Sequence, residues 1–228
     1  LILLLVFTFY LLNKIRKGDD RYFKIIYMFF TVALIVISYR TLLVVNAEYI
    51  HFFQYAILFI PIFALTLKFG ETLFWITLLG TIDEAYQYFI LYPDWKYFDF
   101  NDVILNLLGG GIGAMLIYTL LNSNHLFLSQ NHSSLRKWTK SPVVVTSISL
   151  LLFTLILYIS GHLQLYPGAN SSTVLILLSR TPPPTDFWIR LDWGKTYHIL
   201  YPVEGVVLTG LLIGFYSLID YRIRSRCK

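Results

Sequence analysis

The stretch that decides the fold is residues 83–113, DEAYQYFILYPDWKYFDFNDVILNLLGGGIG, where a polar loop joins two long apolar runs. Five acid and amide side chains flank this loop: Glu84, Gln87, Asp99, Asp102 and Asn106. Carboxylates at membrane depth are costly, so they are few and usually mark functional positions. The segment therefore predicts two membrane helices with a polar site near the point where they are joined.

The composition is that of an integral membrane protein. Of the 228 residues, 57% are hydrophobic and 14% are charged, whereas a soluble domain carries roughly 25% charged residues. Because a spanning helix satisfies its own backbone in lipid, we predict an all-α, polytopic transmembrane helix bundle surrounded by membrane lipids. The single cysteine excludes an internal disulfide, and the net charge of +5 reflects topology rather than nucleic-acid binding.

A spanning helix needs about 20 mostly apolar residues. Six complete candidate stretches occur, at 23–45, 50–68, 72–92, 101–121, 142–160 and 200–219. Residues 1–12 resemble the end of a seventh span, with a cleaved signal peptide as the alternative. The chain opens on Leu rather than Met, which leaves open whether the first span is truncated.

Lysine and arginine set the predicted orientation, since cytoplasmic loops are enriched in them. If seven spans alternate, thirteen of the 18 basic residues fall on one side and five on the other. We therefore expect about seven spans with a cytoplasmic C-terminus.

The predicted organisation has four parts. They are an N-terminal span fragment with a basic cytoplasmic loop (1–24), a four-helix membrane domain (25–121), a cytoplasmic linker (122–141) and two further spans (142–228). The last part includes an outer segment at 161–199, for which a lid over the polar residues, a partner-docking surface and an interfacial loop remain open.

Three pairs of polar residues have the spacing that places them on one helix face. They are His51 with Tyr55, Glu84 with Gln87, and Asp102 with Asn106. Under the predicted topology all three pairs lie toward the outer side. We expect these six residues, with Lys96 and Asp99 of the loop, to line one outward-facing ligand-binding pocket.

Simpler structural roles stand beside this hypothesis. Asp99 has the position of a helix N-cap, His51 could bond a backbone carbonyl at the interface, and Asn106 could bond across helices. Glu84 is harder to explain without function, because a carboxylate at that depth needs a partner or a proton. Gly109 and Gly113 form a G-x-x-x-G pattern, which predicts close packing against a neighbouring helix.

Catalysis has little support in the sequence. A membrane hydrolase or transferase using Glu84 or Asp102 as general acid and base is one hypothesis. No nucleophile motif or cofactor motif accompanies these acids, and the His and acid spacing matches no standard zinc pattern. We leave enzymatic activity open, lean against it, and expect no metal and no cofactor.

Residues 25–120 resemble the VanZ-like family of bacterial membrane proteins. The pattern begins at EYIHFFQYAIL, where His51, Tyr55 and Leu58 match, and EAYQ matches at Glu84 and Gln87. The third part of the pattern, DFNDVILNLLG, matches at Asp99, Asp102, Asn106 and Gly109, and Gly113 fits the second glycine of the family. One departure is Lys96, which stands where the family has arginine and cannot form the bidentate fork of a guanidinium.

The resemblance implies a protein of the bacterial cytoplasmic membrane from a family named for glycopeptide (teicoplanin) resistance. We expect an outward-facing polar pocket that binds or shields a lipid-linked or amphiphilic ligand of the cell envelope. The alternative is an accessory structural subunit of a larger complex, with other membrane subunits as partners.

Overall fold

The protein is described from a computed structural model. The described residues are 9–11, 13–16, 20–44, 46–91, 97–121, 141–161, 163–164, 176–177 and 187–225.

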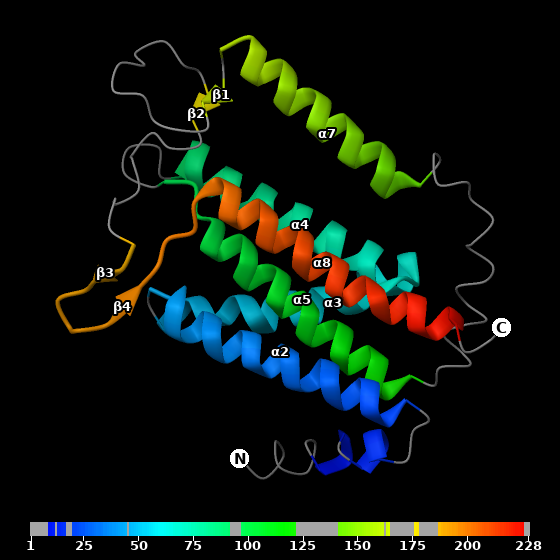
Figure 1. Ribbon diagram of the computed structural model, residues 1–228. Helices are drawn as coiled ribbons and strands as arrows, with labels where there is room; N and C mark the ends of the chain where they lie inside the picture. The colour runs from blue at the N-terminus through cyan, green and yellow to red at the C-terminus, as the bar shows by residue number, and fades with distance from the viewer. Residues whose placement is uncertain are drawn as a thin grey trace.

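The chain is all-α, as its composition predicts (Figure 1). The helical elements are α2 (Arg21–Thr41), the 3₁₀ turn η1 (Asn46–Tyr49), α3 (Ile50–Thr66), α4 (Phe69–Tyr86), the π-helical turn η2 (Gln87–Leu91), α5 (Phe100–Leu120), α7 (Pro142–Ile159) and α8 (Pro202–Ser225). Each of the six apolar stretches coincides with one of the α-helices. Within the described residues, four helices, namely α2, α5, α7 and α8, are long and apolar enough to cross a membrane, and α3 is a shorter apolar helix.

The described strands are two residues long and form two small sheets. In one sheet β1 (Leu163–Gln164) pairs in parallel with β2 (Ile176–Leu177). In the other β3 (Ile189–Arg190) pairs antiparallel with β4 (Thr196–Tyr197), around a turn in which Gly194 has a positive φ of 86°. Figure 1 places the second sheet beside the ends of α2 and α8.

Helix α5 is the central helix of the bundle, because three successive glycines let three different helices approach it. A Cβ at Gly109 would lie 2.8 Å from the His51 carbonyl oxygen on α3, and one at Gly110 would lie 2.8 Å from Leu73 Cδ2 on α4. A Cβ at Gly111 would meet the Tyr216 ring on α8. Successive helical residues point about 100° apart, so the glycine run removes side chains from most of the circumference.

Helix α8 shares the core of the preceding helices although it follows them by more than 80 residues. Tyr216, Ile219 and Ile223 belong to the same buried cluster as Phe69 and Leu73 of α4. The buried hydroxyl of Tyr216 also hydrogen-bonds Thr31 of α2 at 2.8 Å. Helices α2, α3, α4, α5 and α8 therefore form one packed bundle.

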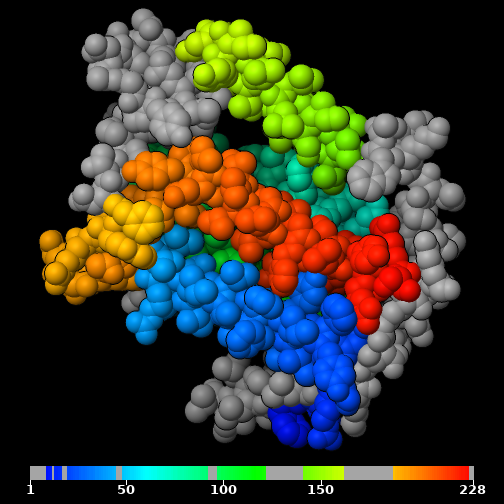
Figure 2. All heavy atoms as spheres, in the orientation of Figure 1, coloured from blue at the N-terminus to red at the C-terminus, as the bar shows by residue number. Residues whose placement is uncertain are grey.

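Helix α7 differs from the bundle helices in having no buried side chain. In Figure 2 it stands clear of α8 across an open gap, and Figure 1 shows it running alongside α8 in the opposite direction. In a membrane, lipid or another protein would have to cover its apolar surface.

The bundle has two chemically distinct ends. At the end called here the site end, α3, α5 and α8 begin and α2 and α4 finish. At the opposite end, Arg222 Nε of α8 lies 3.6 Å from the Asp20 carboxylate before α2, and Lys24 Nζ lies 5.2 Å from the centre of the Tyr118 ring on α5. Helices α2, α3, α4 and α5 therefore alternate in direction, as spans joined by short loops must, and α8 runs in the same direction as α5.

Candidate functional site

The site end brings an imidazole and a carboxylate together from α3 and α5. His51 Nε2 lies 4.0 Å from Asp102 Oδ1, and both side chains are mostly buried. This separation fits an ion pair when the imidazole is protonated and is too long for a direct hydrogen bond. His51 Nδ1 is buried and has no hydrogen-bond partner among the described residues. The pair therefore offers an oriented imidazole with one nitrogen available.

Glu84 occupies the last turn of α4 and is only 1% exposed. Its Oε1 accepts a 2.8 Å hydrogen bond from the backbone N–H of Asp99. A buried carboxylate is stabilised by such bonds, so Glu84 joins the end of α4 to the residue that caps α5. Packing by neighbouring residues, and not contact with water, holds the Glu84 side chain in position.

Gln87 starts the π-helical turn η2, which widens the last turn of α4. Its amide donates a 3.0 Å hydrogen bond to Asp83 Oδ2 near the surface. The π turn changes the direction in which successive side chains point, and such turns are frequent at functional sites. Gln87 is half-buried, whereas Glu84 one turn earlier is enclosed.

Asp99 is the N-cap of α5. Its Oδ1 accepts a 2.8 Å hydrogen bond from the backbone N–H of Asn101, which satisfies one of the free donors at the helix start. The structural role foreseen for Asp99 is thus present. Because Glu84 bonds the Asp99 N–H, the cap also connects α4 with α5.

Asn106 lies one turn below Asp102 and is 1% exposed. It fills the space above Gly80 of α4, where a Cβ would lie 2.8 Å from its Nδ2. Asn106 Oδ1 is buried without a hydrogen-bond partner in the described part of the chain. A buried acceptor left unbonded is unfavourable, so this oxygen is a candidate contact for a ligand donor.

Two tyrosines extend the polar cluster toward the surface. Burial, then the nearby Asp99 and other acidic groups, raises the pKa of Tyr97 above its usual value. The pKa of Tyr197 on β4 is raised by burial, then by Asp99 and by Glu48. Both phenols therefore stay neutral donors at physiological pH. Tyr55 on α3 is buried beneath this group, within electrostatic reach of Asp102.

Sequence reasoning did not include Asn101 among the site residues, although its side chain makes three hydrogen bonds at this end. Its Nδ2 donates to the carbonyl oxygens of Leu42 at 2.9 Å and His198 at 2.8 Å. Its Oδ1 accepts from the Leu200 N–H at 2.9 Å. Asn101 thus fastens the end of α2 and the segment before α8 to the start of α5. Its partners are 59 and about 100 residues away in the chain, so spacing could not reveal them.

His198 and Glu204 form a second cluster beside Asn101. Both ring nitrogens of His198 have acceptors: Nδ1 lies 2.8 Å from the Phe187 carbonyl oxygen, and Nε2 lies 3.2 Å from Glu204 Oε2. Glu204 Oε2 also accepts a 2.9 Å hydrogen bond from the Tyr201 N–H. The glutamate at position N3 of a capping box bonds the N-cap residue in the same way. The Phe187 ring stacks on His198 with a 4.2 Å centroid separation. Segment 187–201 is thereby held over the start of α8.

Several of the residues singled out in the sequence lie at the site end, in separate pairs. His51 of α3 approaches Asp102 of α5, and Glu84 of α4 bonds the backbone of Asp99. Whether these residues line one pocket stays a prediction. Lys96 lies outside the described residues, as does most of 161–199. Gly109 and Gly113 pack closely against α3. A Cβ at Gly109 would lie 2.9 Å from Tyr55 Cβ, and one at Gly113 would lie 2.7 Å from the Ala56 carbonyl oxygen.

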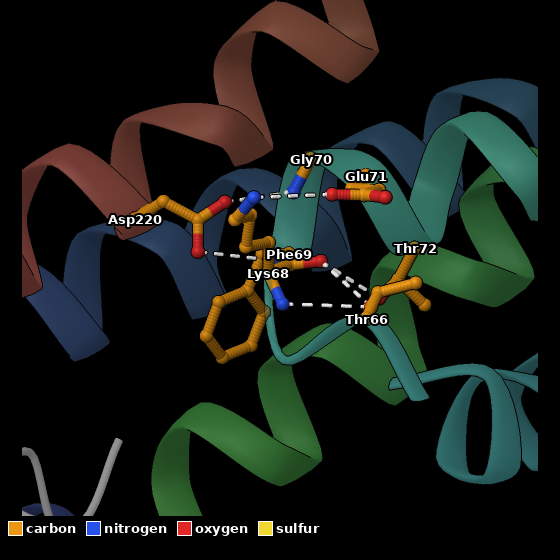
Figure 3. Close-up of polar contacts among 7 residues, drawn as sticks. All are labelled: Thr66, Lys68, Phe69, Gly70, Glu71, Thr72 and Asp220. Atoms are coloured by element: carbon orange, nitrogen blue, oxygen red, sulfur yellow. Dashed lines mark hydrogen bonds and ion pairs between the residues drawn. The ribbon is translucent and has the colours of Figure 1, made fainter. Parts of the chain in front are cut away.

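A separate carboxylate stabilises the opposite end of the bundle (Figure 3). Asp220 of α8 points at the first turn of α4 and accepts hydrogen bonds from the N–H groups of Phe69 and Gly70, each at 2.9 Å. Lys68 and Glu71 form a local ion pair at 3.3 Å in the same turn. Asp220 therefore caps α4 from a helix that is distant in the chain. This capping role accounts for the buried Asp220 carboxylate without invoking a bound ligand.

Comparison with known families identifies the class of protein. A family model described as VanZ/LLP1 matches residues 1–122, more than half of the chain. The chain therefore belongs to the VanZ/LLP1 family. The match includes all the candidate site residues named from the sequence and ends before α7 and α8. No curated protein and no solved structure matches the chain.

Proposed function

We propose that this VanZ/LLP1 protein spans the bacterial cytoplasmic membrane about seven times, with the site end outward and the C-terminus in the cytoplasm. The distribution of basic residues supports this topology. The alternating directions of α2 to α5 fit it, and the basic residues Lys24 and Arg222 lie at the end opposite to the site end.

The proposed function is to bind or shield a lipid-linked or amphiphilic ligand of the cell envelope through the polar cluster at the site end. One observation supports this function above the others. Asn106 is buried one turn from Asp102 on α5 and packs against Gly80 of α4, yet its Oδ1 has no hydrogen-bond partner among the described residues. A polar ligand group that donates a hydrogen bond to this oxygen would remove that cost. The apolar part of an amphiphile would stay in the surrounding lipid.

Binding without chemistry fits the residues better than catalysis. His51 and Asp102 resemble a base and its orienting acid, but no serine, threonine or cysteine is among the residues that make up the cluster. An acyl transfer that depends on a serine, threonine or cysteine nucleophile therefore has no candidate attacking group among these residues. The association of the family with glycopeptide resistance suggests envelope intermediates as ligands.

The alternative function is that of an accessory subunit in a larger membrane complex. It is favoured by α7, an 18-residue apolar helix without a buried side chain. Ligand binding at the site end gives the apolar surface of α7 no role. In a larger complex, a helix of a partner subunit would pack on this surface.

Gentle solubilisation followed by native mass spectrometry separates the two functions. A bound envelope lipid at a one-to-one ratio, with no second polypeptide, supports ligand binding. A stoichiometric partner polypeptide and no such lipid supports the subunit function. A bare monomer after extraction in native membrane lipid contradicts both.

A further inference from the structure

One described feature that the polar cluster does not explain is an apolar cavity of about 230 Å³ near the opposite end of the bundle. It lies between the N-terminal helical segment, α2 and α5. Ten residues line it: Leu11, Ile15, Met28, Thr31, Val32, Ile35, Ile112, Met115, Leu116 and Thr119. The hydroxyl of Thr31 is bonded to Tyr27 and Tyr216. The cavity therefore offers hydrocarbon contacts and almost no free polar group.

Along the helix axes the cavity lining covers about two-thirds of the hydrocarbon depth of one leaflet. On α5 its lining runs from Ile112 to Thr119, which corresponds to about 10 Å along the helix axis. The hydrocarbon core of one leaflet is about 15 Å deep. The lining of α2, from Met28 to Ile35, has the same length. An extended acyl chain lying along both helices would fill such a space.

Three basic residues are close in the chain to residues that line the cavity. Lys14 and Arg16 flank the lining residue Ile15 in the N-terminal segment, and both are exposed. Lys24 is one turn before the lining residue Met28 on α2, and its ammonium lies over Tyr118, next to the lining residue Thr119. Positive charge at the end of an apolar cavity complements a lipid whose headgroup is anionic.

We propose that this cavity binds one acyl chain of an anionic glycerophospholipid, with its phosphate beside Lys14 and Arg16. The lipid comes from the leaflet next to the start of α2. That leaflet is the cytoplasmic one under the proposed topology, but binding itself does not depend on which side this is. The site is separate from the polar cluster, so loss of one does not require loss of the other.

A matched pair of variants tests the cavity. Val32 and Val36 are one turn apart on α2 and are both 54% exposed, but only Val32 lines the cavity. The purified protein is titrated with palmitoyl-oleoyl phosphatidylglycerol in native mass spectrometry. Val32→Trp should weaken the first binding event at least tenfold, and Val36→Trp should leave it unchanged. Equal effects of the two variants would overturn the proposal.

A second pair tests the headgroup. Lys14→Gln with Arg16→Gln removes two charges, which at membrane surfaces corresponds to roughly thirtyfold in affinity. Arg40→Gln with Arg190→Gln removes two exposed charges at the site end and should have no effect. Phosphatidylcholine with the same acyl chains should bind the unmodified protein much more weakly than phosphatidylglycerol. Equal binding of the two lipids would overturn the anionic assignment.

A measurement on the unmodified protein covers the case in which a variant fails to fold. Phosphatidylglycerol carrying a photoactivatable diazirine in one acyl chain should label peptides containing 28–35 and 112–119. Helix α7 has no buried side chain and reports non-specific lipid contact. Labelling confined to α7 would show that no acyl chain occupies the cavity.

Discussion

Asp220 on α8 accepts hydrogen bonds from the backbone N–H groups of Phe69 and Gly70 at the start of α4, although 150 residues separate them. This carboxylate does for α4 what a local N-cap does in most helices. The residue before α4, Lys68, makes no side-chain cap. Helix α8, which follows the region matched by the family model, thus completes a helix inside that region.

Removing this cap should destabilise the whole bundle. Asp220→Ala leaves two buried N–H groups without their acceptor, and hydrogen bonds to a charged group contribute about 1.5–3 kcal/mol each. We expect a loss of about 2–4 kcal/mol in unfolding free energy, measured by denaturant titration in detergent. Glu71→Gln, which breaks only the ion pair with Lys68, should cost less than about 1 kcal/mol. Similar costs for both would contradict the capping role.

Gly113 of α5 and Gly214 of α8 should respond in opposite ways to alanine. At Gly113 a Cβ would meet Phe59 and the Ala56 carbonyl oxygen, whereas at Gly214 it would meet no atom within 4 Å. Gly113→Ala should destabilise by about 1–3 kcal/mol through overpacking. Gly214→Ala should be neutral or stabilise by roughly 0.5–1 kcal/mol, as alanine does in an open helix. Thermal unfolding in detergent distinguishes the two, and a stable Gly113→Ala protein would contradict close packing of α3 on α5.

Asn101 should be essential for attaching the segment before α8. Asn101→Ala removes the side-chain amide that bonds the Leu42 and His198 carbonyl oxygens and the Leu200 N–H. Each of these groups that stays unsatisfied costs about 1–3 kcal/mol of stability. We expect faster proteolysis within 187–200 and a lower melting temperature. Gln54→Ala, which removes an exposed amide from α3, serves as the control. Unchanged proteolysis of Asn101→Ala would show that other contacts hold the segment.

The topology predicts which ends are accessible to a thiol reagent. In a Cys227→Ser background, Trp188→Cys should react in intact cells because this exposed residue lies at the site end. Arg224→Cys near the end of α8 should react only after the membrane is permeabilised. The reverse pattern would place the polar cluster in the cytoplasm.

The sequence predicted the helices well because apolar length and turn chemistry are local properties. The stretch 142–160 is a helix at Pro142–Ile159, and 101–121 is one at Phe100–Leu120. The stretch 200–219 is longer in the structure, reaching Ser225, because Asp220 and Arg222 have partners on other helices and need not lie in water. A span predicted from local hydropathy ends where the charged residues begin. Contacts with other parts of the chain allow α8 to continue past them.

Positions on helix faces were predictable, but long-range partners were not. The pairs His51 with Tyr55 and Asp102 with Asn106 follow from spacing alone. The contacts that define Asn101, His198 and Asp220 join segments far apart in the chain, so no local pattern reveals them. Tyr201 and Pro202 followed by Glu204 are a readable helix start, and this signal could have drawn attention to the segment beside His198.

The most direct test of the central claim is the ligand retained by Glu84→Gln. Glu84 is buried in the polar cluster, while Asp83, its neighbour in the chain, is exposed and provides a matched control as Asp83→Asn. Both variants are purified from native membranes, checked for equal melting temperature, and weighed by native mass spectrometry. The proposed function predicts that Glu84→Gln loses the envelope lipid carried by the unmodified protein and that Asp83→Asn keeps it. Equal retention by two folded variants would contradict a ligand site built on Glu84.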